Sequence, residues 1–146
     1  MKIFLIVLLI LPLITACVSG PSKGQLDDEV RRLCEIDGGI KVYETVKLPA
    51  HRFERDGSIY IPSKQTVKPK DGYFYESATT LLREGNPELR QYYFKVYRRA
   101  DGKLLGEAVS YSRVGGDMPG PWHHSWFRCP EEADIVDLNM KVFIKK

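Results

Sequence analysis

The sequence predicts an α+β domain in which a helix at the start of the domain packs on an antiparallel sheet of about five strands. Two observations carry this prediction. Apolar residues recur at helical spacing after residue 25, and three long runs between residues 73 and 113 are rich in β-branched and aromatic side chains. Turn sequences separate those runs, so we expect them to form a central meander.

The helix is expected from residue 25 to residue 37. Leu26, Val30 and Leu33 recur at a spacing that places them on one face. Acidic residues come early in this segment and two arginines come late, an order that suits the helix dipole. The glycine pair at 38–39 then ends the helix.

A strand and a long loop are expected next. Residues 40–48 alternate between apolar and polar side chains, which is typical of a strand, and Pro49 ends it. Residues 49–71 contain three prolines and one glycine among many charges, and they predict a loop with a short strand near residues 58–61.

The meander comprises residues 73–83, 89–99 and 103–113. Residues 84–87 and 100–102 connect these runs with Gly, Asn, Pro and Asp, the residue types that favour tight turns. The sequence therefore predicts three consecutive antiparallel strands.

The C-terminal part is less regular. Residues 115–121 are rich in glycine and proline and predict irregular backbone, followed by an extended segment at 122–129. A helical turn is expected at 130–134 and a final strand at 138–144.

The first sixteen residues have the pattern of a secretory signal peptide. Lys2 supplies a positive start, residues 3–13 are apolar apart from one proline, and small or turn-forming residues follow at 15–22. An uncleaved anchor helix is the alternative. It is disfavoured because the strongly apolar part is shorter than the about 20 residues that span a bilayer.

The segment Ile14-Thr15-Ala16-Cys17 resembles the lipobox of bacterial lipoproteins, an aliphatic residue and two small residues before a cysteine. The resemblance implies diacylglycerol on the Cys17 sulfur, cleavage before Cys17 and acylation of the new amino terminus. Val18 follows, where an aspartate would favour the inner membrane in this family. The resemblance therefore implies lipid anchoring to the outer membrane, with the periplasmic face expected.

These features divide the chain into a signal peptide at 1–16, a flexible tether at 17–24 and a single globular domain at 25–146. Removal of the leader takes away Lys2 and no acid, so 22 basic residues become 21 against 19 acids. The resulting net charge of +2 is too small to predict a nucleic-acid partner.

With Cys17 assigned to lipid, Cys34 and Cys129 remain as a pair in an oxidising compartment. We expect a disulfide between them, which would tie the start of the domain to its end. Two separate buried thiols, or a metal site with nearby histidines, are the alternatives.

The segment from Gly115 to Cys129 is the only cluster that suggests a binding site. It joins a glycine-proline loop to Trp122, His123, His124 and Trp126. One interpretation is a partner-binding lip with the two indoles as anchors. The other is that the indoles cover the end of the core while the histidines lie at its rim.

Metal binding and catalysis are weakly indicated. A metal site would recruit His123 and His124 with His51 and an acid such as Asp117, but adjacent histidines of a strand point to opposite faces. Ser125 beside His124 is not a catalytic triad, because triad partners meet in space. No cofactor is expected, and the protein is not expected to be an enzyme.

The function expected from the sequence is that of a non-enzymatic binding or structural module of the cell envelope. Its expected partners are the membrane, through the lipid, and another envelope protein. Two alternatives remain open. One is an inhibitor or immunity-type lipoprotein directed at a hydrolase or toxin, and the other is a periplasmic hydrolase or metal-binding protein using His123 and His124.

Overall fold

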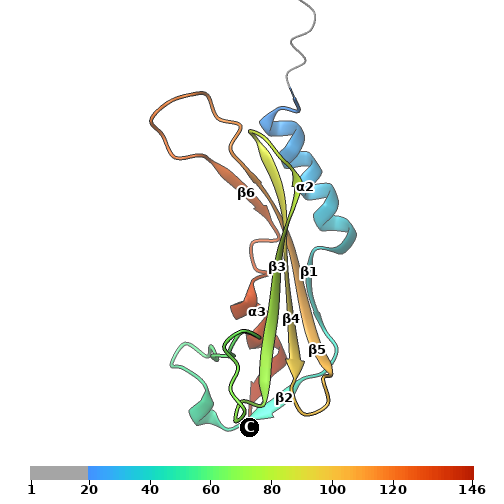
Figure 1. Cartoon of the computed structure of the whole chain (residues 1–146), viewed down its shortest axis with the longest axis vertical. Helices are drawn as coiled ribbons and strands as arrows, with labels where there is room; N and C mark the ends of the chain where they lie inside the picture. The colour runs from blue at the N-terminus through green and yellow to red at the C-terminus, as the bar shows by residue number, and fades with distance from the viewer. Residues whose placement is uncertain (1–19) are drawn as a thin grey trace, which may run out of the picture.

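Three long antiparallel strands form the axis of the molecule in the computed structural model, which describes residues 20–146 (Figure 1). They are β3 (Tyr73–Arg83), β4 (Glu88–Arg98) and β5 (Leu104–Val114), and each pairs with the next. Their high content of β-branched and aromatic residues suits a pleated, half-buried surface. The predicted meander is confirmed.

Two short strands complete a mostly antiparallel five-stranded sheet. β1 (Gly39–Val42) and β6 (Trp126–Cys129) both pair with the edge of β5 that faces away from β4. β1 pairs with the first part of β5 and β6 with its last part. The α+β class and the number of strands in the sheet agree with the sequence prediction.

The prediction of one strand over residues 40–48 is wrong. The chain turns after β1, where the N–H groups of Tyr43 and Glu44 both donate to the carbonyl of Leu105. The next residues form β2 (Val46–Leu48), which pairs in parallel with β7 (Phe143–Lys145) in a separate two-stranded sheet. That partner lies at the other end of the sequence, so local alternation could not reveal it.

The first helix, α2, covers residues Lys23–Asp37 and packs on β5 and β6. The prediction of a helix starting at residue 25 is therefore corrected. The helix lies at 23–37, and it begins inside the segment 17–24 that was expected to be a flexible tether. Ser22 explains the earlier start, because its hydroxyl accepts from the Gln25 N–H while the Gln25 side chain accepts from the Ser22 N–H. The signal peptide and Cys17 lie outside the described residues.

The second helix, α3 (Ile135–Val142), replaces most of the strand expected at 138–144. Asp134 caps it by accepting from the N–H groups of Val136 and Asp137. Leu138 and Val142, four residues apart, are both buried on its inner face. The helical turn expected at 130–134 is also wrong, because regular helix begins only after the Asp134 cap.

The long loop after β2 is confirmed, with one 3-10 turn, η1 (Ala50–Arg52), near its start. The short strand expected at 58–61 does not form. Ile59 and Ile61 instead insert their side chains into the core, and only Ser63 bridges to the edge of β3.

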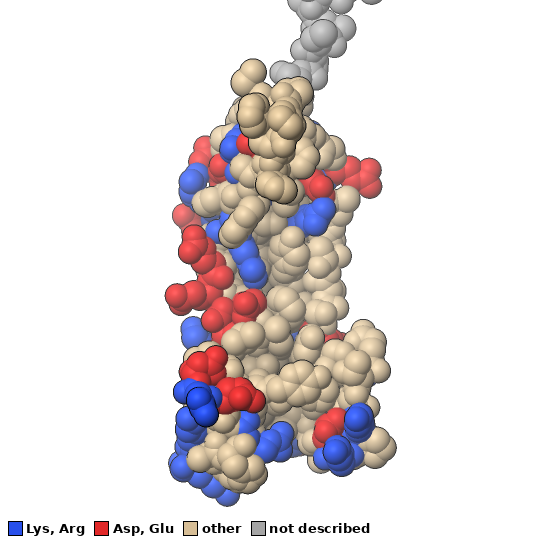
Figure 2. Space-filling view, turned by 90° about the vertical axis from the view of Figure 1, so that its left-hand side faces the viewer, with Lys and Arg blue, Asp and Glu red and all other residues tan. Residues whose placement is uncertain are grey.

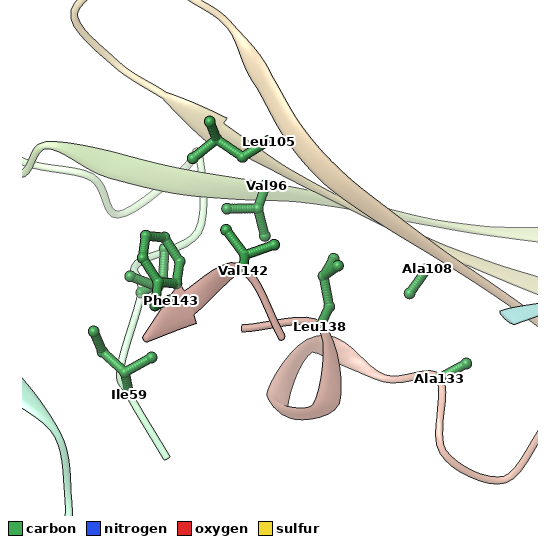
Figure 3. Packing of buried hydrophobic residues seen from close by; sticks show 9 residues of the cluster. Ile59, Val96, Leu105, Ala108, Ala133, Leu138, Val142 and Phe143 are labelled. Atoms are coloured by element: carbon green, nitrogen blue, oxygen red, sulfur yellow. The ribbon is translucent and has the colours of Figure 1, made fainter. Parts of the chain in front are cut away.

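The two helices cover opposite faces of the sheet at opposite ends (Figure 1). In the lower half, Val96, Leu105, Leu138, Val142 and Phe143 form the centre of one buried cluster (Figure 3). The other cluster lies in the upper half beneath α2. Its buried members are Val30, Leu89, Val109 and Tyr111.

A disulfide joins Cys34 of α2 to Cys129 of β6, with an S–S distance of 2.03 Å. The pair predicted from the sequence is therefore present, and it fixes the helix to the strand that precedes the C-terminal helix. Among residues 20–146, no helix is both long and apolar enough to cross a membrane.

Candidate binding site

An open groove lies on the α3 side of the sheet, above the end of that helix. On this side α3 lies in the lower half and the loop at 115–125 extends from the upper half (Figure 1), and Figure 2 views the molecule from this side. The groove has a volume of about 410 Å³. Its lining consists of Tyr92, Ser112, Val114, His124, Trp126 and Arg128.

The register of three strands creates the hollow. On β5, Ser110 and Ser112 point to this face, and their small side chains are buried. Tyr92 is opposite Ser110 on β4, and Arg128 is opposite Ser112 on β6. A row of small residues between two rows of large ones leaves a channel along the central strand, since side chains opposite each other share a face.

Arg128 is held in place along one wall of the groove. Its Nε and Nη2 groups donate to the Ser110 hydroxyl at 3.2 and 3.0 Å, and Nη2 also donates to the Ala133 carbonyl at 3.2 Å. The guanidinium lies 5.6 Å from the centroid of the Tyr92 ring, within the range of a cation–π contact. No ion pair joins Arg128 to a carboxylate within residues 20–146.

The loop above the groove starts from two glycines with positive φ. Gly115 and Gly116 have φ values of 84° and 83°, a conformation that other residues rarely adopt. A side chain at Gly115 would also collide with the Asn86 amide oxygen. The Gly116 N–H donates to that oxygen at 2.6 Å, which joins the loop to the β3–β4 turn.

A buried arginine closes the base of the loop. Arg113 is only 2% exposed, and its Nε donates to Asp27 of α2 at 2.7 Å. Its Nη1 donates to the carbonyls of Gly115 and Ser125 at 2.7 and 3.0 Å, so the two ends of the loop share one donor. The charge stays paired despite its burial, and it connects helix and loop.

Asp117 makes a second attachment. Its carboxylate accepts from Lys23 Nζ of α2 at 2.8 Å and from the backbone N–H and hydroxyl of Ser125 at 2.6 and 2.8 Å. The Lys23 ammonium and the two Ser125 donors hold the pKa of Asp117 well below its usual value of 3.8. The loop is therefore fixed at both ends, and the segment between them extends away from the sheet.

The four residues singled out from the sequence are exposed, but only two of them line the groove. Trp122 and Trp126 are 69% and 66% exposed, so the interpretation that they cover the end of the core is wrong. His124 and Trp126 lie at the upper end of the groove. Trp122 and His123 lie further along the loop and do not line it.

The residues considered for a metal site do not come together. His51 lies in η1 at the lower end of the molecule, far from the loop (Figure 1). Asp117 is engaged by Lys23 and Ser125. In the part of the chain that the structure describes, no group of three His, Cys, Asp or Glu side chains is arranged to hold an ion.

Sequence reasoning did not identify Tyr92, Ser112 and Arg128 as a group. The three residues belong to three different strands, and only the pairing register of those strands brings their side chains to one face of the sheet. The sequence signal that could have indicated the groove is the series of small residues at every second position, because small side chains on one face of a central strand leave a hollow. These residues are Ala108, Ser110 and Ser112.

The comparisons with known proteins add no relative. No family model, curated protein or solved structure matches the chain.

Proposed function

We propose that the protein is a lipid-anchored lipoprotein of the cell envelope that acts as a non-enzymatic binding module. The observation that carries the proposal is the exposure of Trp122, on a loop whose base is fixed by Arg113 and Asp117, and of Trp126 at the start of β6. Large exposed aromatic residues on a preorganised support are typical of binding hot spots, because little conformational entropy is lost on association.

The anchor is part of the same proposal. The lipobox resemblance supplies a lipid on Cys17, and the described chain starts at the upper end of the molecule, close to α2 and the loop (Figure 1). A short tether would then keep the binding end near the membrane. Val18 favours the outer membrane, and we propose the periplasmic face as the location.

Crosslinking in intact cells tests the binding site. A photoreactive amino acid at position 122 or 126 is expected to capture an envelope component. The same group at Tyr60, which is 75% exposed in the lower loop, serves as the matched control and is expected to capture much less. Equal capture at all three positions, or none at 122 and 126, would contradict the proposal.

The anchor has an independent test. Cys17→Ala is expected to stop lipid attachment and cleavage before residue 17, so that the unlipidated full-length precursor accumulates in place of the processed protein. Metabolic labelling with a radioactive fatty acid measures the lipid directly. Unchanged labelling and unchanged processing in the variant would contradict lipid anchoring at this residue.

A second candidate function is inhibition of, or immunity against, an envelope hydrolase or toxin. The loop at 115–125 projects from the end of the sheet (Figure 1), and Met118 within it is 84% exposed. A projecting segment on a fixed base has the form needed to enter an active-site cleft. If this is its role, the partner captured at position 122 will be a hydrolase or toxin that the purified protein inhibits, and Trp122→Ala will relieve the inhibition.

A further inference from the structure

The groove contains a cation with unused hydrogen-bonding capacity. A guanidinium has five N–H donors. Nε and Nη2 of Arg128 are occupied by Ser110 and Ala133, and within residues 20–146 the Nη1 group has no acceptor. Since its other contacts hold the guanidinium in one orientation, the free donors belong to a fixed group on the groove wall.

The charge balance of the groove favours an anion. Arg90, on the same strand face as Tyr92, is paired with Glu88 at 2.8 Å, so those two charges offset each other. Arg128 has no such partner in the described chain, and a net positive charge remains on its wall. A carboxylate fits the planar guanidinium because two oxygens can accept from it at once.

The other lining groups suit a saccharide ring. Trp126 offers an exposed indole at the upper end, and the Tyr92 ring lies along the wall. Flat aromatic faces stack on the C–H face of a sugar ring, and the Tyr92 hydroxyl, which accepts from the Ser112 hydroxyl at 3.4 Å, keeps its own proton to donate to a sugar hydroxyl. The volume of about 410 Å³ falls within the range of small-ligand sites.

A peptide fits this surface less well. The floor of the groove is β5, whose backbone groups pair with β4 on one side and with β6 on the other. An extended peptide lying across it would find no main-chain partners, and its own N–H and C=O groups would lose their hydration without compensation.

We propose that the groove binds a carboxylate-bearing saccharide, with Arg128 holding the carboxylate and Trp126 stacking on a sugar ring. This inference rests on the proposed function, because it names the ligand class for the same exposed end of the domain. It also assigns a ligand-binding role to Arg128, which the exposed aromatic side chains alone would not suggest.

Calorimetric titration of the folded domain tests the inference with defined probes. A galacturonic acid oligosaccharide is the acidic probe, and a galactose oligosaccharide of equal length is the neutral one. We expect the acidic probe to bind at least about tenfold more tightly, since a hydrogen bond to a charged group contributes more than a neutral one. An oligoglutamate peptide provides the same carboxylate without a sugar ring and is expected to bind more weakly than the acidic saccharide.

Variants locate the site. Arg128→Gln and Trp126→Ala are each expected to weaken acidic saccharide binding about tenfold or more, and Arg128→Lys to weaken it less because it keeps the charge but loses the planar fork. Arg55→Gln removes the same charge from the exposed lower loop and is the matched control, expected to bind as the wild type does. If Arg128→Gln fails to fold, the binding measured for Trp126→Ala and Arg128→Lys still decides whether the groove is the site.

Equal binding of acidic and neutral saccharides, tighter binding of the peptide, or full binding by the Arg128 and Trp126 variants would each overturn the inference. So would a complete absence of saccharide binding. If crosslinking at positions 122 and 126 still captured an envelope protein in that case, the proposed binding function would stand and only the ligand assignment would fall.

Discussion

The two halves of the molecule are stabilised in different ways. In the lower half, α3 and the strands enclose an apolar cluster around Leu138 and Phe143 (Figure 3). In the upper half, a smaller apolar cluster beneath α2 is supplemented by the disulfide and by the buried Arg113 with its partners. The lower half is thus the main apolar core, while the upper half uses covalent and polar attachments that also fix the position of the loop.

This difference indicates a division of roles. Apolar packing is non-directional and stabilises whatever shape fills the space. Hydrogen bonds to a guanidinium or a carboxylate have defined directions, so they determine where a particular segment lies. The exposed aromatic residues are at the end of the molecule where the directional attachments are found. Four perturbations test that division.

Removing the disulfide should have the largest effect on stability. The double variant Cys34→Ala with Cys129→Ala frees a loop with a sequence separation of 95 residues, and chain entropy predicts a loss of about 4–5 kcal/mol. Urea unfolding measures the loss. Amide exchange should show α2 opening before α3. Simultaneous opening of both helices would contradict the separation of the two halves.

Truncating the lower core should cost stability without moving the loop. Leu138 is fully buried, so Leu138→Ala is expected to lower the free energy of unfolding by about 3–4 kcal/mol through lost transfer energy and a cavity. At low temperature, where the variant stays folded, crosslinking at position 126 should match that of the wild type. Met140→Ala, at an exposed position of the same helix, is the control with little expected effect.

Replacing the buried arginine should affect both stability and the loop. Arg113→Met leaves Asp27 and the Gly115 carbonyl without their donor and leaves the Ser125 carbonyl with the Gly115 N–H alone, so we expect the free energy of unfolding to fall by about 3 kcal/mol. Unlike Leu138→Ala, it should also reduce capture at positions 122 and 126 in protein that is still folded. If the two variants changed capture equally, the upper network would not be what positions the loop.

The smallest effect concerns pH. Because the pKa of Asp117 is lower in the folded protein than its usual 3.8, its contribution to stability is present above that value and is lost as the pH falls below it. NMR titration of the carboxyl group should give a midpoint below 3.8, and Lys23→Ala should raise that midpoint. A midpoint at the usual value in the wild type would show that Lys23 and Ser125 do not hold the carboxylate in solution.

Local sequence determined the elements that depend on neighbouring residues. The meander followed from three β-rich runs and their turn sequences, since antiparallel strands joined by short turns need only local information. The helix at 23–37 was predicted from its periodicity, although the Ser22 cap moved its start. A disulfide between Cys34 and Cys129 was expected because the lipobox resemblance implies lipid on Cys17, and the disulfide is present in the structure.

Tertiary structure alone decided the features that depend on distant residues. β2 pairs with β7 across almost the whole sequence, and residues 138–142 form a helix because their apolar positions pack against the sheet. The groove arises only when Tyr92, Ser112 and Arg128 are brought into register on three strands. Periodicity reports which side of an element is apolar, but not which element covers it. The sequence therefore singled out the aromatic segment at 115–129 but left open whether its indoles are exposed, and the fold decided their exposure and placed the cation and the hollow beside them.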